Sequence, residues 1–180
     1  DDHKEHDDHK EHDDHKEHDV DQHVWLDPKN AKFIIDVIEL ELSKIDPENS
    51  DLYKQNATIS KNKIDSLLHD TSHKFEKFDD FGFIYFHDAF QYFEKRFGLK
   101  ASGAISISVE TLPGAKRIKE LRKIINQSNV KCVFTEPQFN SKIIDTIIEG
   151  TGKKAIVLDP LGADITPNKD LYFKLIKRIN

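Results

Sequence analysis

The chain has 180 residues, of which 33% are charged and 37% are hydrophobic, and its formal net charge is −6. This length is enough for one ordinary domain or slightly more. The net negative charge comes from residues 1–18. Removing their nine acidic and three basic residues from the totals of 33 and 27 leaves 24 of each in the rest of the chain. The neutral remainder has no basic stripe, which argues against a nucleic-acid binder. No apolar run approaches the roughly 20 residues of a membrane-spanning helix, so we expect no transmembrane segment in this chain.

Two further features of composition bear on the origin and redox state of the chain. It opens with Asp1 and Asp2 and contains no methionine, so we expect a processed or truncated piece of a longer protein. The single cysteine, Cys132, cannot form an internal disulfide and lies in an apolar run. We expect it to be a small buried hydrophobic residue.

Residues 1–18 are a low-complexity tract, three copies of DDHKEH without any apolar side chain. Nothing in this tract can offset the entropy of ordering it, so we expect disorder in the absence of a ligand. Imidazoles alternating with carboxylates suit the capture of borderline metal ions. The alternative is a solvated spacer. The six histidines concerned are His3, His6, His9, His12, His15 and His18.

Two helices are predicted after the tract. Asp27 and Pro28 have the pattern of an N-cap followed by a proline in the first turn, and Asp46-Pro47 would end this helix. The second helix should run over 47–77. Its apolar stripe is sparse, and a long polar helix of this kind suits a bridge between two lobes.

From residue 81 onward, extended runs alternate with helical ones. Four strands separated by helices predict an α/β lobe of about a hundred residues, with a small parallel sheet covered on both faces. The strands are expected in FGFIYFH (81–87), KASGAISIS (100–108), KCVFTE (131–136) and KAIVLD (154–159), and the helices in 88–98, from Pro113 onward, in 140–149 and in 168–179.

Three polar residues end predicted strands: His87, Glu136 and Asp159. In open α/β sheets ligands bind beyond the carboxyl ends of the strands. Each residue alone is explained as well by a structural role, but three metal-capable groups at one edge favour a metal site. Imidazole and carboxylate ligands fit zinc or manganese, and imidazole favours zinc.

Three other histidines each allow two interpretations. His23 precedes Val-Trp-Leu and a helix cap, where it is either a packing residue or a ligand. His69 and His73 are spaced i, i+4 on the bridging helix and could pair on a metal, but on a Lys-rich helix a solvated face is the favoured interpretation. The sequence has no HExxH, CxxC, glycine-rich phosphate loop or GxSxG motif.

Four motifs carry a resemblance to a known family. They are HVWLDP (23–28), FHDAFQYFEKRFGL (86–99), CVFTEPQF (132–139) and LDPLG (158–162). In this order they resemble the ZnuA-type zinc-binding proteins of high-affinity zinc ABC importers, which belong to the bilobed metal solute-binding proteins. A histidine-rich tract directly before the HVWLDP-like segment also fits that family.

The resemblance implies a fold of two α/β lobes joined by a long rigid helix. It makes His23 and His87 two of three zinc-binding imidazoles, places Asp159 at or near the ion, and gives Glu136 a supporting role behind the ligands. It also implies a periplasmic or extracytoplasmic zinc-binding protein, not an enzyme, that delivers Zn²⁺ to an ABC-transporter permease. Manganese is the second choice of ion.

The family's amino-terminal lobe, with its own zinc histidine, has no counterpart in this chain. We therefore expect four parts: the tract 1–18, a remnant of the amino-terminal lobe at 19–46, the bridging helix at 47–79 and the carboxyl-terminal lobe at 80–180. Two alternatives stay open. One is a stand-alone histidine-rich zinc buffer or metallochaperone, and the other is a metal-dependent hydrolase using His87, Asp159 and Glu136.

Overall fold

A computed structural model describes residues 21–76, 82–105, 114–127 and 129–180. The histidine-rich tract therefore lies outside the described residues. The elements in chain order are η1 (Val24–Leu26), α1 (Pro28–Ile45), η2 (Pro47–Asn49), α2 (Ser50–Phe75), β1 (Gly82–Tyr85), α3 (Gln91–Phe97), β2 (Gly103–Ala104), α4 (Ala115–Gln127), β3 (Val130–Thr135), α5 (Ser141–Ile148), β4 (Lys154–Val157) and α6 (Leu171–Ile179).

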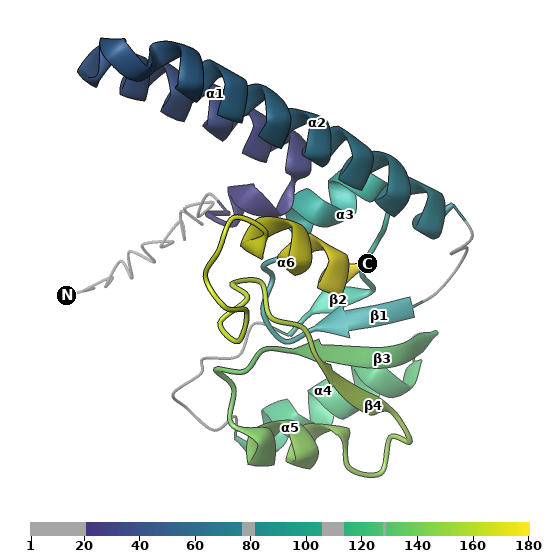
Figure 1. The fold of residues 1–180 in the computed structure, drawn as a ribbon. Helices are drawn as coiled ribbons and strands as arrows, with labels where there is room; N and C mark the ends of the chain where they lie inside the picture. The colour runs from purple at the N-terminus through teal and green to yellow at the C-terminus, as the bar shows by residue number, and fades with distance from the viewer. Residues whose placement is uncertain (1–20, 77–81, 106–113, 128) are drawn as a thin grey trace, which may run out of the picture.

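The four strands form one parallel sheet in the order β2-β1-β3-β4. Helices α3 and α6 cover one face and α4 and α5 the other, while the α1–α2 hairpin lies outside α3 and α6 (Figure 1). The predicted α/β class with a four-stranded parallel sheet is confirmed. Among the described strands, coverage is incomplete at the edge strand β4, where Ile156 and Val157 are exposed.

Alternating side chains of β1 divide the core into two clusters. Phe83 and Tyr85 point towards α3 and α6, whereas Ile84 and the following Phe86 point towards α4 and α5. This period of two is what a strand buried on both faces requires. Cys132 belongs to the first cluster and is buried, as expected from the sequence, and burial raises the pKa of its thiol.

The hairpin of α1 and α2 forms as the cap and turn residues predict. The Asp27 carboxylate accepts a hydrogen bond from the backbone N–H of Lys29, and Pro28 occupies the first turn. Ion pairs Lys32–Asp65 and Lys61–Asp36 cross-link the two helices. In the described part of the chain, no helix has both the length and the apolar character needed to cross a membrane.

The hairpin of α1 and α2 leaves several large apolar side chains exposed. Phe33 is 69% exposed and Ile45 80% exposed. Spacings of three and four residues place Phe33, Ile34, Val37 and Ile38 on one side of α1, and exposed apolar area of this kind favours association with another surface. The other exposed large apolar residues of the hairpin are Leu40, Leu42, Leu52 and Ile59.

Two glycines are required by the backbone around the sheet. A Cβ on Gly82 would lie 2.3 Å from the carbonyl oxygen of Asn129, so the start of β1 can approach β3 only without a side chain. Gly98 ends α3 with φ of 69°, a left-handed conformation that glycine adopts without strain.

Candidate metal centre

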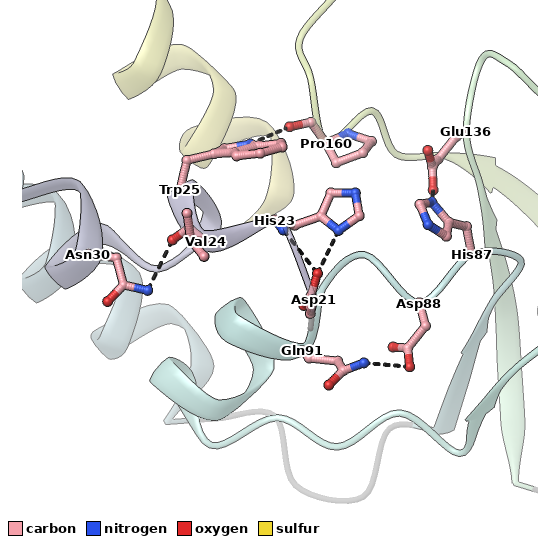
Figure 2. A network of polar contacts seen from close by, with 10 residues as sticks. All are labelled: Asp21, His23, Val24, Trp25, Asn30, His87, Asp88, Gln91, Glu136 and Pro160. Atoms are coloured by element: carbon pink, nitrogen blue, oxygen red, sulfur yellow. Dashed lines mark hydrogen bonds and ion pairs between the residues drawn. The ribbon is translucent and has the colours of Figure 1, made fainter. Parts of the chain in front are cut away.

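The strand ends bring three predicted site residues to one edge of the sheet. His87 follows β1, Glu136 follows β3 and Asp159 follows β4, and these three strands are parallel neighbours. Because parallel strands end at the same edge, residues distant in sequence become adjacent there. Figure 2 shows His87 and Glu136 facing each other at this edge.

The His87 ring is held by the Glu136 carboxylate. Its Nδ1 lies 2.7 Å from Glu136 Oε1, and Glu136 is only 5% exposed. A carboxylate on one ring nitrogen fixes the ring orientation and leaves Nε2 for a metal, an arrangement common behind histidine ligands. The loop carrying His87 is fixed further by a 2.7 Å hydrogen bond from Gln91 Nε2 to Asp88 Oδ2.

The pKa of Glu136 is raised above its ordinary value. Burial is the main cause, the nearby Asp159 adds to it, and the imidazoles of His87 and His23 oppose it. A buried carboxylate is costly to ionise unless positive charge is close. Protonated imidazole or a bound cation would relieve that cost at this edge.

His23 lies in the turn just before η1, where Asp21 fixes it. Asp21 Oδ1 accepts a 3.0 Å hydrogen bond from the His23 backbone N–H and lies 2.7 Å from His23 Nδ1 (Figure 2). Asp21 is not among the site residues expected from the sequence. The signal for it was an aspartate two positions before a histidine, where a side chain can bond both the backbone and the ring.

The tertiary structure brings His23 and His87 together. Their ring centres are 5.0 Å apart, with planes inclined by 72°. With zinc–nitrogen bonds of about 2.0–2.1 Å, two imidazoles on one tetrahedral ion have ring centres about 5 Å apart. Within the described ranges, no cluster of three or more His, Cys, Asp or Glu residues is arranged to hold an ion. The described part of this edge therefore presents a pair of imidazoles, each backed by a carboxylate.

The segment carrying His23 is anchored to the α/β lobe. Trp25 Nε1 donates a 3.0 Å hydrogen bond to the carbonyl of Pro160, and the Tyr172 hydroxyl donates one of 2.9 Å to the carbonyl of Trp25. Leu26 is fully buried in the core cluster on the α3–α6 side of the sheet. His23 is thus positioned by the same lobe that carries His87.

Asp159 differs from the other site residues in its contacts. Both of its oxygens accept backbone hydrogen bonds, Oδ1 from Leu161 at 2.9 Å and Oδ2 from Ala163 at 2.6 Å. These bonds shape the turn that presents the Pro160 carbonyl to Trp25. Asp159 also lies near enough to Glu136 to raise its pKa.

A cavity of about 540 Å³ lies elsewhere. Its lining includes Gly82 and Asn129, which stand at the starts of β1 and β3. The lining also includes Tyr85, Phe134 and Leu158, but neither His23 nor His87. Ligands of parallel sheets bind at the carboxyl edge, which is the edge where the His23 and His87 rings lie.

A parallel α/β lobe with carboxylate-backed imidazoles at the carboxyl edge of its sheet is typical of a metal-binding protein. The chain belongs to the ZnuA family, described as zinc-uptake complex component A, periplasmic, whose family model matches residues 1–179. This is a family of solute-binding transport proteins and not of enzymes, and the resemblance inferred from the four motifs is confirmed.

Curated relatives agree with this membership. The chain is 43% identical over 159 residues to the high-affinity zinc uptake system protein ZnuA of Brucella abortus, covering 88% of this chain and 48% of that protein. It is 32% identical over 159 residues to the protein of the same name from Haemophilus ducreyi, covering 88% and 51%. The chain thus spans about half the length of the curated relatives it matches.

Solved structures share the fold. The laminin-binding adhesin Lmb of Streptococcus agalactiae, in a mutant structure, matches with a TM-score of 0.75 and 36% identity, over 88% of this chain and 60% of that one. A Zn(II)-bound mutant variant of AdcAII from Streptococcus pneumoniae matches with a TM-score of 0.73 and 34% identity, over 88% and 59%.

Proposed function

We propose that this chain is the metal-holding carboxyl-terminal part of an extracytoplasmic zinc-binding protein that delivers Zn²⁺ to the membrane permease of an ABC importer. The observation that carries the proposal is the His23–His87 pair at ligand spacing. Periplasmic location and the permease partner are inferred from the family description and the relatives' names.

In this proposal Nε2 of His23 and Nε2 of His87 bind the ion. Asp21 and Glu136 occupy Nδ1 of the two rings and so favour that choice of nitrogen. A further histidine from an amino-terminal lobe would be the third ligand, with Asp159 at or near the ion. Because imidazole coordinates only when unprotonated, zinc affinity should fall on acidification. Manganese, a harder ion, suits this nitrogen-rich set less well.

We propose the following division of the chain. Residues 1–18 capture metal, 80–180 form the carboxyl-terminal lobe, and 47–79 contain the bridging helix. The remaining segment, 19–46, is shared between two lobes. Its start, with His23, is anchored on the carboxyl-terminal lobe, and the exposed apolar face of α1 is suited to packing against the other.

The bridge is suited to limited motion. The ion pairs between α1 and α2 link the two helices side by side (Figure 1). If the two helices move as one unit, few residues remain that could act as a hinge between the lobes. Release of zinc would then depend on small shifts of the loop that carries His87.

The tract 1–18 would act by raising the local zinc concentration. A tethered set of weak imidazole sites increases the chance of capture near the cleft, to an extent set by the length of the tether. A second candidate function, a stand-alone zinc buffer, rests on the same composition. It assigns all binding to the tract.

Calorimetric zinc titrations of three variants separate these functions. His87→Ala should weaken the tightest site, whereas deletion of residues 1–18 should lower the stoichiometry and leave that site intact. Glu149→Gln, at a carboxylate that is 77% exposed, serves as the surface control. Loss of all binding on deletion of 1–18, with no effect of His87→Ala, would favour the buffer and reject the transport component.

A further inference from the structure

A second pair of histidines lies on α2, away from the centre described above. Their rings, those of His69 and His73, have centres 4.9 Å apart and planes inclined by 88°. This distance is close to the 5.0 Å of His23 and His87. Two imidazoles at i, i+4 on one helix face can bind the same ion, as they do in helical zinc motifs.

The pair faces solvent and is accessible to an ion. The buried residues of α2 are Ala57, Ile64, Leu67 and Thr71, which the helical period places on the opposite face. His69 is exposed, and the His73 side chain is 64% exposed. Because the stretch is exposed and rich in lysine, the sequence pattern alone favours a solvated helix face. Exposure does not prevent the two rings from chelating an ion.

A carboxylate backs one ring of this pair as well. His73 Nδ1 lies 3.1 Å from Glu76 Oε2, one helical turn further on. Just as at His87, this contact occupies Nδ1 and leaves Nε2 for a metal. Among the described residues, His73–Glu76 joins His23–Asp21 and His87–Glu136 as a contact between a histidine ring and a carboxylate. It lies beside the second imidazole pair.

The electrostatic surroundings also favour a cation. The pair lies in the last turns of α2, which ends at Phe75, and the carbonyls at a helix C-terminus carry partial negative charge. The adjacent cation on this stretch, Lys74, donates a 3.0 Å hydrogen bond to Asn180 Oδ1. The positive charge of Lys74 is therefore held close to Asn180, the residue that follows α6.

We propose that His69 and His73 form an accessory surface site for a borderline divalent cation such as Zn²⁺. The two imidazoles supply the protein ligands, Glu76 orients His73, and water completes the coordination. No third His, Cys, Asp or Glu within the described residues joins them as a ligand. Such a site binds more weakly than a closed site of four protein ligands.

The test is histidine footprinting with diethyl pyrocarbonate on the full chain, because total zinc stoichiometry would also count the histidines of residues 1–18. Carbethoxylation of each histidine is measured by peptide mass spectrometry across a ZnCl₂ titration. His69 and His73 should become protected together. In His69→Ala, the zinc concentration that half-protects His73 should rise at least about tenfold, since chelation by the second ring is lost.

Two variants provide controls. Alanine is a good helix former, so His69→Ala on this exposed face should leave the fold intact, which circular dichroism checks. His87→Ala should leave protection of the α2 pair unchanged, which separates this site from the proposed transport site. Unaltered protection of His73 in His69→Ala, or no zinc protection of either ring in the parent chain, would overturn the proposal.

Discussion

Arg96 binds Asp27 with two parallel hydrogen bonds, Nε to Oδ1 and Nη2 to Oδ2, both of 2.6 Å. Asp27 is 6% exposed and also caps α1. Since Arg96 lies on α3, which follows the His87 loop, the contact joins the segment of His23 to that of His87. It also raises the pKa of the Arg96 guanidinium, so this group stays charged.

Arg96→Ala should destabilise the protein and weaken zinc binding. It leaves a buried carboxylate without its cation, and breaking such a pair costs about 3 kcal/mol. The free energy of unfolding, measured in urea, should fall by that amount, and calorimetry should show a lower zinc affinity because one contact that holds the His23 segment is lost.

Arg178→Ala is the matched control for this prediction. Arg178 pairs with Asp164 where both side chains are more than half exposed. An exposed pair contributes at most about 1 kcal/mol. Equal destabilisation by the two substitutions would contradict a special role for the Arg96–Asp27 contact.

Glu136→Gln should weaken zinc binding while the fold persists. The amide keeps the shape and a hydrogen-bond acceptor but loses the charge that makes the His87 ring a better ligand. Loss of a carboxylate behind a ligating histidine typically costs about 10–100-fold in metal affinity. Competition with a chromogenic chelator measures this, and Asp145→Asn, on the exposed side of α5, is the control. An unchanged affinity would exclude Glu136 from the site.

Glu94 should make stability depend on pH. Burial raises the pKa of its carboxyl above the ordinary 4.5, although a hydrogen bond from the Ala101 backbone N–H opposes the rise. At pH values between the ordinary pKa of 4.5 and the raised pKa of the folded state, Glu94 holds a proton in the folded state that it has lost in the unfolded state. Stability therefore falls as pH rises through that interval.

Glu94→Gln tests this sign. The amide oxygen can still accept from Ala101, but the cost of a buried charge is gone. Urea titrations at several pH values should show a gain in stability for the variant at neutral pH and no gain well below pH 4.5, where the carboxyl is protonated in both states. A gain of the same size at every pH would refute the assignment to ionisation.

The exposed face of α1 should make the isolated chain self-associate. Phe33 and Ile38, 69% and 51% exposed, lie on it. Phe33→Lys together with Ile38→Lys should shift the chain towards monomer in sedimentation velocity, because removing apolar area from a contact weakens it. Glu149→Gln, the surface control away from α1, should change nothing. A parent chain that is already a stable monomer, with strong amide protection over 33–42, would contradict the prediction.

The sequence by itself determined the local elements and the carboxyl-edge residues. Strand runs separated by helices specify a parallel sheet, and His87, Glu136 and Asp159 follow such runs directly. Asp27 and Pro28 likewise start α1 through interactions within one turn. These features depend on neighbours in the chain, which is why patterns reveal them.

The family resemblance implied roles for His23, His87 and Glu136, but only the tertiary structure decided how these side chains meet. The segment of His23 is held by Trp25, which reaches Pro160 far along the sequence. Glu136 reaches His87 because β1 and β3 are paired in the sheet. Side chains that meet through long-range packing leave no periodic signal, because their distance is set by how the elements dock and not by their spacing along the chain.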